Sequence, residues 1–307
     1  MNYTHANEHT LTKPSATCEF SQPPTKSRYK QPCCGMPPLG DLQPSPSAVC
    51  ILANIRKTIN QMRRQRCGKS ASRPQVRKST VRAEQKELNV TPVHSVNIAF
   101  KTATFGMGCF WGAESLFGGT QGILRTTVGY EGGSKDSPTY RSLGDHTEVL
   151  EIDYDPKTIS FKQLLDLFWN NHEYGLTNPI KRQYMSLILY HDDEQKKIAE
   201  ESIVEEQKKR VPEKIITEIL PKGKFYPAED YHQKYRLQGH KDLAETLNLD
   251  AKLLRTSYVA TKLNGYLAGV GGVKQFKEEI DTLGLTPSQK EYCLYQVEQN
   301  EGMGLYC

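Results

Sequence analysis

The chain has 307 residues, enough for one good-sized domain with additions or for two small domains. The net charge of +5 is uneven, because residues 1–95 carry fifteen Lys and Arg against five Asp and Glu, about +10, which leaves about −5 for the remainder. No apolar run approaches the roughly 18 residues of a membrane span, and the polar first residues lack the apolar core of a secretory signal. We therefore expect no membrane partner.

Residues 1–95 are predicted to form a disordered basic extension, because they are rich in Pro, Ser, Gln, Thr and Arg and show no sustained periodicity. Within them, residues 42–83 contain ten Lys and Arg and no acidic residue, a composition that resembles a mitochondrial presequence. It lies far from Met1, but a start at Met62 would give a transit peptide that opens Met-Arg-Arg-Gln-Arg. An unconstrained extension, a targeting segment and a nucleic-acid-binding tail all stay open. We expect a cytoplasmic protein, with mitochondrial targeting as the alternative.

A strand, a glycine turn and a helix are predicted in succession around Cys109. Residues 98–106 alternate apolar and polar side chains in the manner of a half-buried strand, and apolar residues then recur at helical spacing over 110–118. Cys109 stands at the junction, beside the unpaired N–H groups and the positive end of the helix dipole, which favour thiolate over thiol. A buried structural cysteine is the alternative, but the flanking glycines and the adjacent Phe-Trp pair favour a reactive one.

The following elements complete an alternation of strands and helices. Strands are predicted over 123–130, 147–154 and 185–190, with a loop to about residue 145 between the first two. A helix opens at Ser160, where Ser-Phe-Lys-Gln has the form of a capping box. The order strand–helix–strand–strand–helix–strand is that of the split βαβ arrangement, with helices layered on an antiparallel sheet. We therefore predict an α+β fold, a two-layer sandwich built on a ferredoxin-like core.

The second half of the chain is predicted to be mainly helical. A surface helix over 192–210 has acids in its first turn and basic residues in its last, and an edge strand follows near 215–219. Residues 239–300 have the pattern of three or four short helices. The chain after the extension is thus divided into a catalytic domain, residues 96–235, and a helical C-terminal extension, residues 236–307.

Glu148 is a carboxylate on the apolar face of a predicted strand. In that strand it shares the face with Leu150, Ile152 and Tyr154. A carboxyl on a buried face resists ionisation, so its pKa is expected to rise. A glutamate at a strand end that reaches solvent is the alternative.

Three stretches resemble a known family. Gly-Cys-Phe-Trp-Gly-Ala-Glu at residues 108–114 is similar to the active-site signature of the peptide methionine sulfoxide reductases of the A type. His-Thr-Glu at residues 146–148 stands where that family has Gly-His-Ala-Glu, and Phe225–Tyr235 resembles its closing core segment. The resemblance covers roughly residues 97–235 and implies an α+β sandwich, in agreement with the pattern of elements.

The resemblance implies reduction of methionine sulfoxide by a thiol, with no metal and no bound cofactor. Cys109 would attack the sulfoxide sulfur while Glu148 gives a proton to the oxygen, so that methionine leaves and Cys109 becomes a sulfenic acid. The class that the chain resembles acts on the S epimer, free and in proteins. Repair of oxidative damage is the implied role.

Four aromatic residues complete the implied substrate site. Tyr140 and Tyr184 match two tyrosines of the family, whose hydroxyls would hydrogen-bond the sulfoxide oxygen without adding charge. Phe110 and Trp111 would form the apolar wall that receives the S-methyl group. Without the motifs, a tyrosine in a chain with sixteen of them is more simply a residue at the edge of a core.

Two C-terminal cysteines are assigned to recycling. Cys307 ends a glycine-containing tail that can reach Cys109, and Cys293 is near enough in sequence to form a second disulfide with Cys307. Thioredoxin is the implied reductant, and the long C-terminal form resembles the version of the family found in insects. Eight cysteines are too sparse for a disulfide framework in a chain of this length and suit a reducing compartment. That either cysteine is inert stays open.

Departures from the family pattern leave some assignments open. The usual Asn-Gly-Tyr-Cys-Gly-Leu-Gly segment after the Tyr-His-Gln motif is absent, and Pro179 replaces the usual Asp before Tyr184. A peroxide-consuming thiol enzyme and a nucleic-acid-binding protein led by its basic arm are the competing interpretations. We expect a monomer whose partners are thioredoxin, free methionine sulfoxide and oxidised proteins, without nucleic acid.

Overall fold

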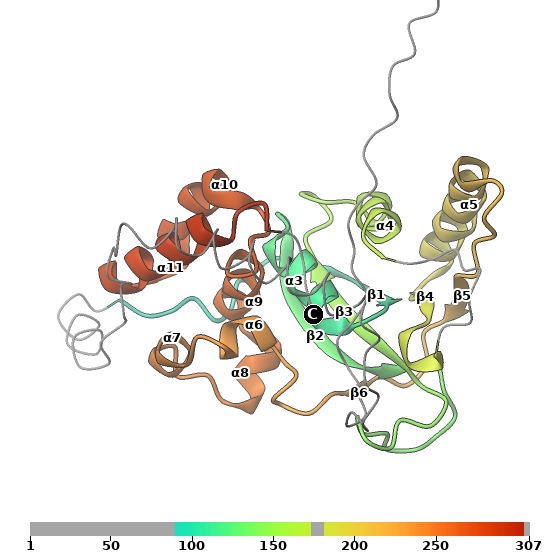
Figure 1. Ribbon diagram of the computed structural model, residues 1–307, viewed down its shortest axis with the longest axis horizontal. Helices are drawn as coiled ribbons and strands as arrows, with labels where there is room; N and C mark the ends of the chain where they lie inside the picture. Colours follow the sequence, from blue (N-terminus) through green and yellow to red (C-terminus); the bar gives the residue numbers. More distant parts are fainter. Residues whose placement is uncertain (1–89, 173–180, 304–307) are drawn as a thin grey trace, which may run out of the picture.

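The chain folds around one mixed sheet, with helices on one face and a further group of helices beside it (Figure 1). The computed structural model describes residues 90–172 and 181–303. Residues 1–89, on which the targeting and nucleic-acid-binding interpretations depend, lie outside the described part, as do Pro179 and Cys307. Among the described helices, none has both the length and the apolar character of a membrane span.

Six strands of the described chain form the sheet. They are β1 (Lys101–Met107), β2 (Ile123–Glu131), β3 (Thr147–Tyr154), β4 (Ser186–Tyr190), β5 (Glu218–Pro221) and β6 (Tyr226–Pro227). Their order is β5-β4-β1-β3-β2-β6, with β1 antiparallel to both β3 and β4, and β2 antiparallel to β3. This is the strand order and direction of the split βαβ arrangement, so the predicted ferredoxin-like core is confirmed. β5 adds in parallel to β4, and β6 pairs with β2 at the other edge.

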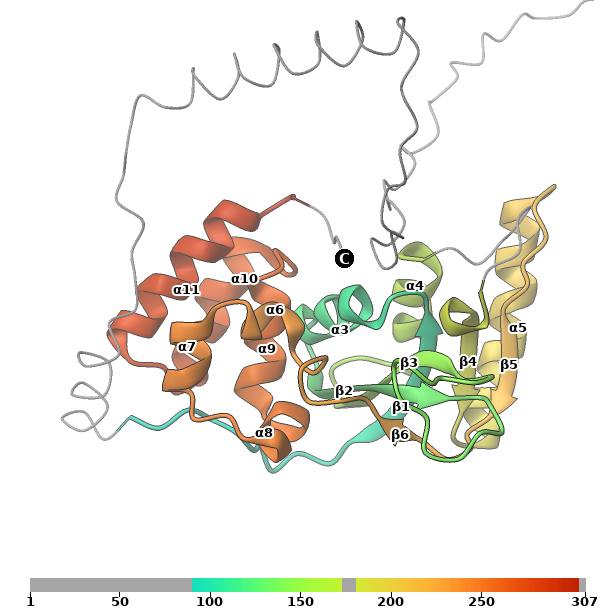
Figure 2. The ribbon, with the colours of Figure 1, turned by 60° about the horizontal axis from the view of Figure 1, so that its bottom comes forward.

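Three helices cover one face of this sheet (Figure 2). They are α3 (Phe110–Gly119), α4 (Phe161–Asn170) and α5 (Asp193–Arg210). α3 connects β1 to β2, α4 connects β3 to β4, and α5 packs on α4 and on the β4–β5 edge. Side-chain caps begin the last two, since Ser160 opens α4 in the predicted capping box and Asp192 caps α5.

The main core fills the space between these helices and the sheet. The ring of Phe105 on β1 lies 5.8 Å from that of Phe117 on α3, 6.0 Å from Phe161 and 5.1 Å from Phe168 on α4, measured between centroids. All four side chains are buried, and each such burial contributes about 1.5–3 kcal/mol. Because α3 is held against the sheet in this way, Cys109 at its start has a defined place at the end of β1.

The helical extension forms a second group of elements packed against α3. Its helices are α6 (Tyr235–Gln238), α7 (Lys241–Thr246), α8 (Ala251–Thr256), α9 (Tyr258–Tyr266), α10 (Gly272–Glu279) and α11 (Pro287–Asn300), around a core of their own. Five of these α-helices lie between residues 239 and 300, where we predicted three or four. Ser257 explains part of the difference in number. It is the residue that ends α8, and its side chain also caps α9, so a single residue separates two helices.

Glycines allow α9 to pack closely on α3. A Cβ atom at Gly265 would overlap the backbone of Gly119, and one at Gly118 would overlap the carbonyl oxygen of Thr261. The two helices therefore meet backbone to backbone at the last turn of α3. Gly118 and Gly119 are the last two residues of α3, and both lie in this contact with the extension.

The described chain begins within the segment that we assigned to the disordered extension. The N–H of Val93 donates to the carbonyl of Leu283 at 3.1 Å, and the carbonyl of His94 accepts from the N–H of Tyr258 at 2.8 Å. These bonds satisfy the backbone of the segment against the helical extension. Val93 and His94, near the end of the segment assigned to the extension, are therefore bonded to the helical part of the chain.

Candidate active site

Cys109 is the N-cap residue of α3, in the turn that joins β1 to that helix. Gly108 makes this turn with a φ of +84°, a left-handed conformation that glycine adopts readily. Since no described atom lies within 4 Å of where a Cβ at Gly108 would stand, backbone conformation rather than space selects glycine here. Cys109 is half-buried beside the first-turn N–H groups, which have no partner inside the helix. The predicted strand, glycine turn and helix start are confirmed.

Glu148 is buried on β3, with 2% of its surface exposed, and shares its face with apolar residues of the strand as predicted. The alternative of a solvent-reaching glutamate at the strand end is therefore wrong. Its Oε2 accepts a hydrogen bond from the backbone N–H of Phe110 at 3.1 Å. Because Phe110 follows Cys109 directly, the carboxyl lies one residue from the cysteine at the start of α3.

Gln183 belongs to this site and was missed by our sequence analysis. Its side-chain amide donates to Oε1 of Glu148 at 2.7 Å, so both carboxyl oxygens accept an N–H group. Gln183 lies in the 3-10 turn η1 (Arg182–Tyr184), and the half-buried Tyr184 ends the same turn. The sequence did place Gln183 next to Tyr184, which matches the family, but nothing in that stretch indicates a hydrogen bond from Gln183 to Glu148.

Three of the four predicted substrate residues meet around a histidine that we did not assign. The ring of His232 lies 5.0 Å from that of Phe110, 5.5 Å from Trp111 and 4.8 Å from Tyr140. Phe110 is buried, while Trp111 and Tyr140 are half-buried. The indole of Trp111 also stacks on Tyr235 at 3.8 Å and 5°. The predicted apolar wall is thus one part of an aromatic cluster, and the substrate roles of its members stay predictions.

Glu229 anchors this cluster from the segment between β6 and α6. Its Oε1 accepts from the backbone N–H of Tyr140 at 3.0 Å, and its Oε2 accepts from the hydroxyl of Tyr130 at 2.8 Å. Burial opposes the charge, but these hydrogen bonds lower the pKa of Glu229, so that it stays an anion. Burial lowers the pKa of His232, whose Nε2 lies 3.9 Å from Oε2 of Glu229.

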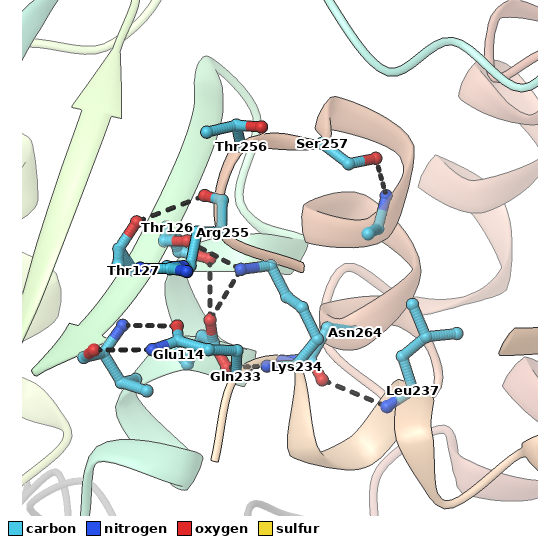
Figure 3. Close-up of polar contacts among 12 residues, drawn as sticks. Glu114, Thr126, Thr127, Gln233, Lys234, Leu237, Arg255, Thr256, Ser257 and Asn264 are labelled. Carbon is cyan, nitrogen blue, oxygen red and sulfur yellow. Dashed lines mark hydrogen bonds and ion pairs between the residues drawn. The ribbon is translucent and has the colours of Figure 1, made fainter. Parts of the chain in front are cut away.

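Glu114, the last residue of the signature, forms a buried ion pair with Lys234 (Figure 3). The Nζ atom of Lys234 donates to Oε1 of Glu114 at 2.7 Å and to the carbonyl of Thr126 on β2 at 2.6 Å. In the next helix, the N–H of Leu237 donates to Oδ1 of Asn264 on α9 at 3.1 Å. These contacts join α3, β2 and the start of the helical extension, which gives the pair a structural role.

The two cysteines assigned to recycling lie near the end of the chain. Cys293 is on α11, which begins after Thr286 with a capping box. Its side chain is fully buried in the core of the helical extension, and this burial raises the pKa of the Cys293 thiol. Burial and the raised pKa both disfavour thiol exchange by Cys293 in this conformation, so the resolving role of Cys293 stays a prediction. Cys307 lies outside the described residues. Over residues 90–172 and 181–303, no group of three His, Cys, Asp or Glu side chains is placed to hold a metal ion.

The fold and the site define an α+β thiol oxidoreductase. The profile of the peptide methionine sulfoxide reductase family matches residues 101–262, and that of the helical domain of selenoprotein methionine sulfoxide reductase A matches residues 248–295. A peptide methionine sulfoxide reductase of Drosophila melanogaster is 76% identical over 229 residues, 75% of this chain and 93% of that protein. The chain belongs to the peptide methionine sulfoxide reductase family.

Further relatives and solved structures are more distant. Peptide methionine sulfoxide reductase A5 of Arabidopsis thaliana is 39% identical over 187 residues, 59% of this chain and 74% of that protein. The crystal structure of Mxr1 of Saccharomyces cerevisiae in its reduced form is 35% identical in sequence, with a TM-score of 0.42. The match spans 45% of this chain and 85% of the Mxr1 chain. Family membership makes this chain an oxidoreductase that acts on methionine sulfoxide, and the resemblance inferred from residues 108–114 is confirmed.

Proposed function

We propose that this chain reduces the S epimer of methionine sulfoxide, free and within proteins, by attack of Cys109 with proton transfer from Glu148, and that thioredoxin recycles the enzyme. One observation carries the proposal: Oε2 of Glu148 accepts the N–H of Phe110, next to Cys109 in the chain, at 3.1 Å. A nucleophile and a proton donor placed so close can act on the two ends of one S=O group.

The reaction transfers one oxygen atom from the methionine sulfur to the cysteine sulfur. The thiolate of Cys109 attacks the sulfoxide sulfur while Glu148 protonates the oxygen, which makes the sulfur a better electrophile. The attack joins the Cys109 sulfur to the methionine sulfur. The oxygen then moves to Cys109 as its bond to the methionine sulfur breaks, the bond between the two sulfurs breaks, and methionine departs. The sulfoxide gains two electrons, Cys109 is oxidised to a sulfenic acid, and Glu148 is left as a carboxylate.

Burial and a fixed orientation suit Glu148 to this role. A carboxyl shielded from water holds a proton more readily than an exposed one, and only 2% of Glu148 is exposed. The N–H donors of Phe110 and Gln183 contact one oxygen each, which fixes the plane of the carboxyl. The acid is therefore already oriented when the sulfoxide arrives, which reduces the entropy lost on binding.

The epimer preference follows from holding two substituents of the sulfur at once. The Phe110–Trp111 pair would receive the methyl group, and Glu148 with the hydroxyls of Tyr140 and Tyr184 would receive the oxygen. The rest of the methionine then extends toward solvent. With the methyl group and the oxygen both held, only one epimer presents its sulfur to Cys109 in line for attack. The family resemblance assigns this epimer as S.

Resolved epimers of an N-acetylated methionine sulfoxide amide test this function. With dithiothreitol as reductant, we expect the S epimer to be converted to the sulfide and the R epimer to remain, because the methyl and oxygen positions reject the mirror arrangement. Chiral liquid chromatography measures both species. Equal consumption of the two epimers would contradict the S assignment, and conversion of neither would contradict the reduction itself.

The path of the chain supports Cys307 as the thiol that resolves Cys109. α3 has ten residues, so its ends are about 15 Å apart, with Cys109 at the start. At its other end, Gln275 of α10 donates to the carbonyl of Gly119 at 2.7 Å, and Asn300 at the end of α11 donates to a carbonyl at the end of α9 at 2.7 Å. Residues 301–303 form a turn in which the N–H of Met303 donates to the carbonyl of Asn300 at 3.1 Å, and the four residues from there to Cys307 span at most about 14 Å. That span is about the length of α3, so the tail is long enough to extend back along the helix.

Cys307→Ser is expected to stop thioredoxin-dependent cycling after one turnover. In the wild type, the thiol of Cys307 would attack the sulfenic sulfur of Cys109, water would leave, and the dithiol of thioredoxin would reduce the resulting disulfide. The variant cannot form that disulfide, so about one methionine per enzyme should appear in a rapid-quench assay.

Dithiothreitol provides the control for this variant. A small dithiol can reach the sulfenic acid directly, so cycling of Cys307→Ser with dithiothreitol should stay close to that of the wild type. Undiminished cycling of the variant with thioredoxin would move the resolving role to Cys293 or elsewhere, and Cys293→Ser is the matched comparison.

A further inference from the structure

His232 contacts the substrate site but has no part in the mechanism above. It lies in the Tyr-His-Gln motif between β6 and α6, and 1% of its surface is exposed. Its ring touches three side chains that we assign to the substrate, at 4.8 Å to 5.5 Å between centroids. A buried ionisable side chain at the centre of a substrate wall requires an explanation beyond packing.

The hydrogen bond from Trp111 determines which nitrogen of His232 carries the proton. The indole N–H can only donate, and Nε1 of Trp111 lies 3.1 Å from Nδ1 of His232. Nδ1 must therefore present a lone pair, and the hydrogen of the neutral ring is on Nε2. That Nε2 is buried and has no hydrogen-bond partner among the described residues, while Oε2 of Glu229 is 3.9 Å away.

Glu229 lies between the histidine and two tyrosines of neighbouring segments. The same carboxylate accepts the backbone N–H of Tyr140 at 3.0 Å and the hydroxyl of Tyr130 at 2.8 Å. The indole of Trp111 is enclosed between His232 and the stacked ring of Tyr235. Removing the acceptor at Nδ1 would thus leave the indole N–H unsatisfied and free the ring to turn.

We propose that neutral His232 is a positioning residue that holds Trp111 as the wall of the substrate pocket, with Nδ1 as the acceptor of the indole N–H. This inference rests on the proposed function, because it assigns Trp111 to the sulfoxide. A second proton on His232 would occupy Nδ1, break the bond to Trp111 and draw the imidazolium toward Glu229. Acidification therefore weakens substrate binding.

The surroundings of the ring agree with this direction. Burial lowers the pKa of His232, which keeps the acceptor form dominant at neutral pH, although Glu229 opposes the shift. The titratable groups of the described chain that face the ring are Glu229 and Tyr231 on its own segment and Tyr140 from the β2–β3 loop. Of these, Glu229 carries the only charge at neutral pH. The acceptor is lost as the pH falls through the lowered pKa.

His232→Leu and His232→Asn form a matched pair that tests the acceptor. Leucine fills similar space without an acceptor, whereas the side-chain oxygen of asparagine can take the place of Nδ1. The readout is the concentration of the S-epimer amide that gives half the maximal rate of the first turnover, without reductant. We expect it to rise about tenfold in His232→Leu and to stay within about threefold of wild type in His232→Asn.

The pH dependence provides a second readout that a structural role would not change. Between about pH 7 and about pH 5, the half-saturating concentration should rise more in the wild type than in His232→Asn, which has no imidazole to titrate at this position. Titration of Cys109 is common to both proteins, so the difference between them isolates His232.

The outcomes separate this inference from the function on which it rests. Equal losses in the two variants, an unchanged His232→Leu, or the same acid-induced rise in His232→Asn as in the wild type would overturn it. If circular dichroism shows that His232→Leu does not fold, the pH comparison of the wild type with His232→Asn still tests whether His232 acts as the acceptor. A wild type that does not turn over the S epimer would overturn the proposed function, and the inference with it.

Discussion

Cys109→Ser is expected to abolish the conversion of methionine sulfoxide to methionine. A serine hydroxyl is a far weaker nucleophile than a thiolate, and it cannot become the sulfenic acid that carries the oxygen away. Methionine formed in the first turnover, measured by liquid chromatography without reductant, should fall from about one per enzyme to below detection. This is the largest effect that we expect from any single substitution.

The loss in Cys109→Ser should be one of chemistry and not of folding. Cys109 is the half-buried N-cap residue of α3, and serine is among the favoured N-cap residues. Thermal unfolding of the variant should therefore match that of the wild type or lie slightly higher. In a Cys307→Ser background, a sulfenic-acid reagent such as dimedone should label Cys109 only after sulfoxide is added. Retained reduction by a folded Cys109→Ser protein would reject the assignment.

Glu148→Gln is expected to slow the first turnover by about 10²- to 10⁴-fold, the usual contribution of a positioned general acid. The amide keeps the shape of the carboxyl and can donate a hydrogen bond, but it has no proton to transfer. Its oxygen can still accept the N–H of Phe110, and Gln183 can turn its own amide to accept from the new donor. Folding should therefore change little, and rapid-quench kinetics at neutral pH measure the loss.

Glu151→Gln provides the matched control on the same strand. Glu151 lies three residues further along β3, on the opposite face, where its Oε2 pairs with Lys222 at 2.5 Å. A partly exposed pair of this kind contributes little to stability, and the residue is not in the site. Its first-turnover rate should equal that of the wild type, so any loss specific to Glu148→Gln reflects the acid. Unchanged turnover of Glu148→Gln would remove Glu148 from the mechanism.

Local patterns in the sequence were sufficient to predict the core. The β3 bounds were predicted as 147–154 and observed as Thr147–Tyr154, because period-2 alternation specifies a half-buried strand. The start of α4 at Ser160 was predicted from a capping box, which depends on residues three apart. Errors were concentrated in the helical extension, where helices as short as α7 and α8 give too few turns for a periodic signal.

The sequence by itself determined the position of Cys109 at a helix start and of Glu148 on a buried face, because both follow from contacts between neighbours along the chain. Only the tertiary structure decided that Gln183 holds Glu148, that His232 accepts from Trp111, and that Cys293 is buried. The hydrogen bond of His232 joins residues 121 positions apart, and no local pattern encodes such a pairing. The physical reason is that a side chain's partner depends on how whole elements pack, whereas its place within an element depends on its neighbours.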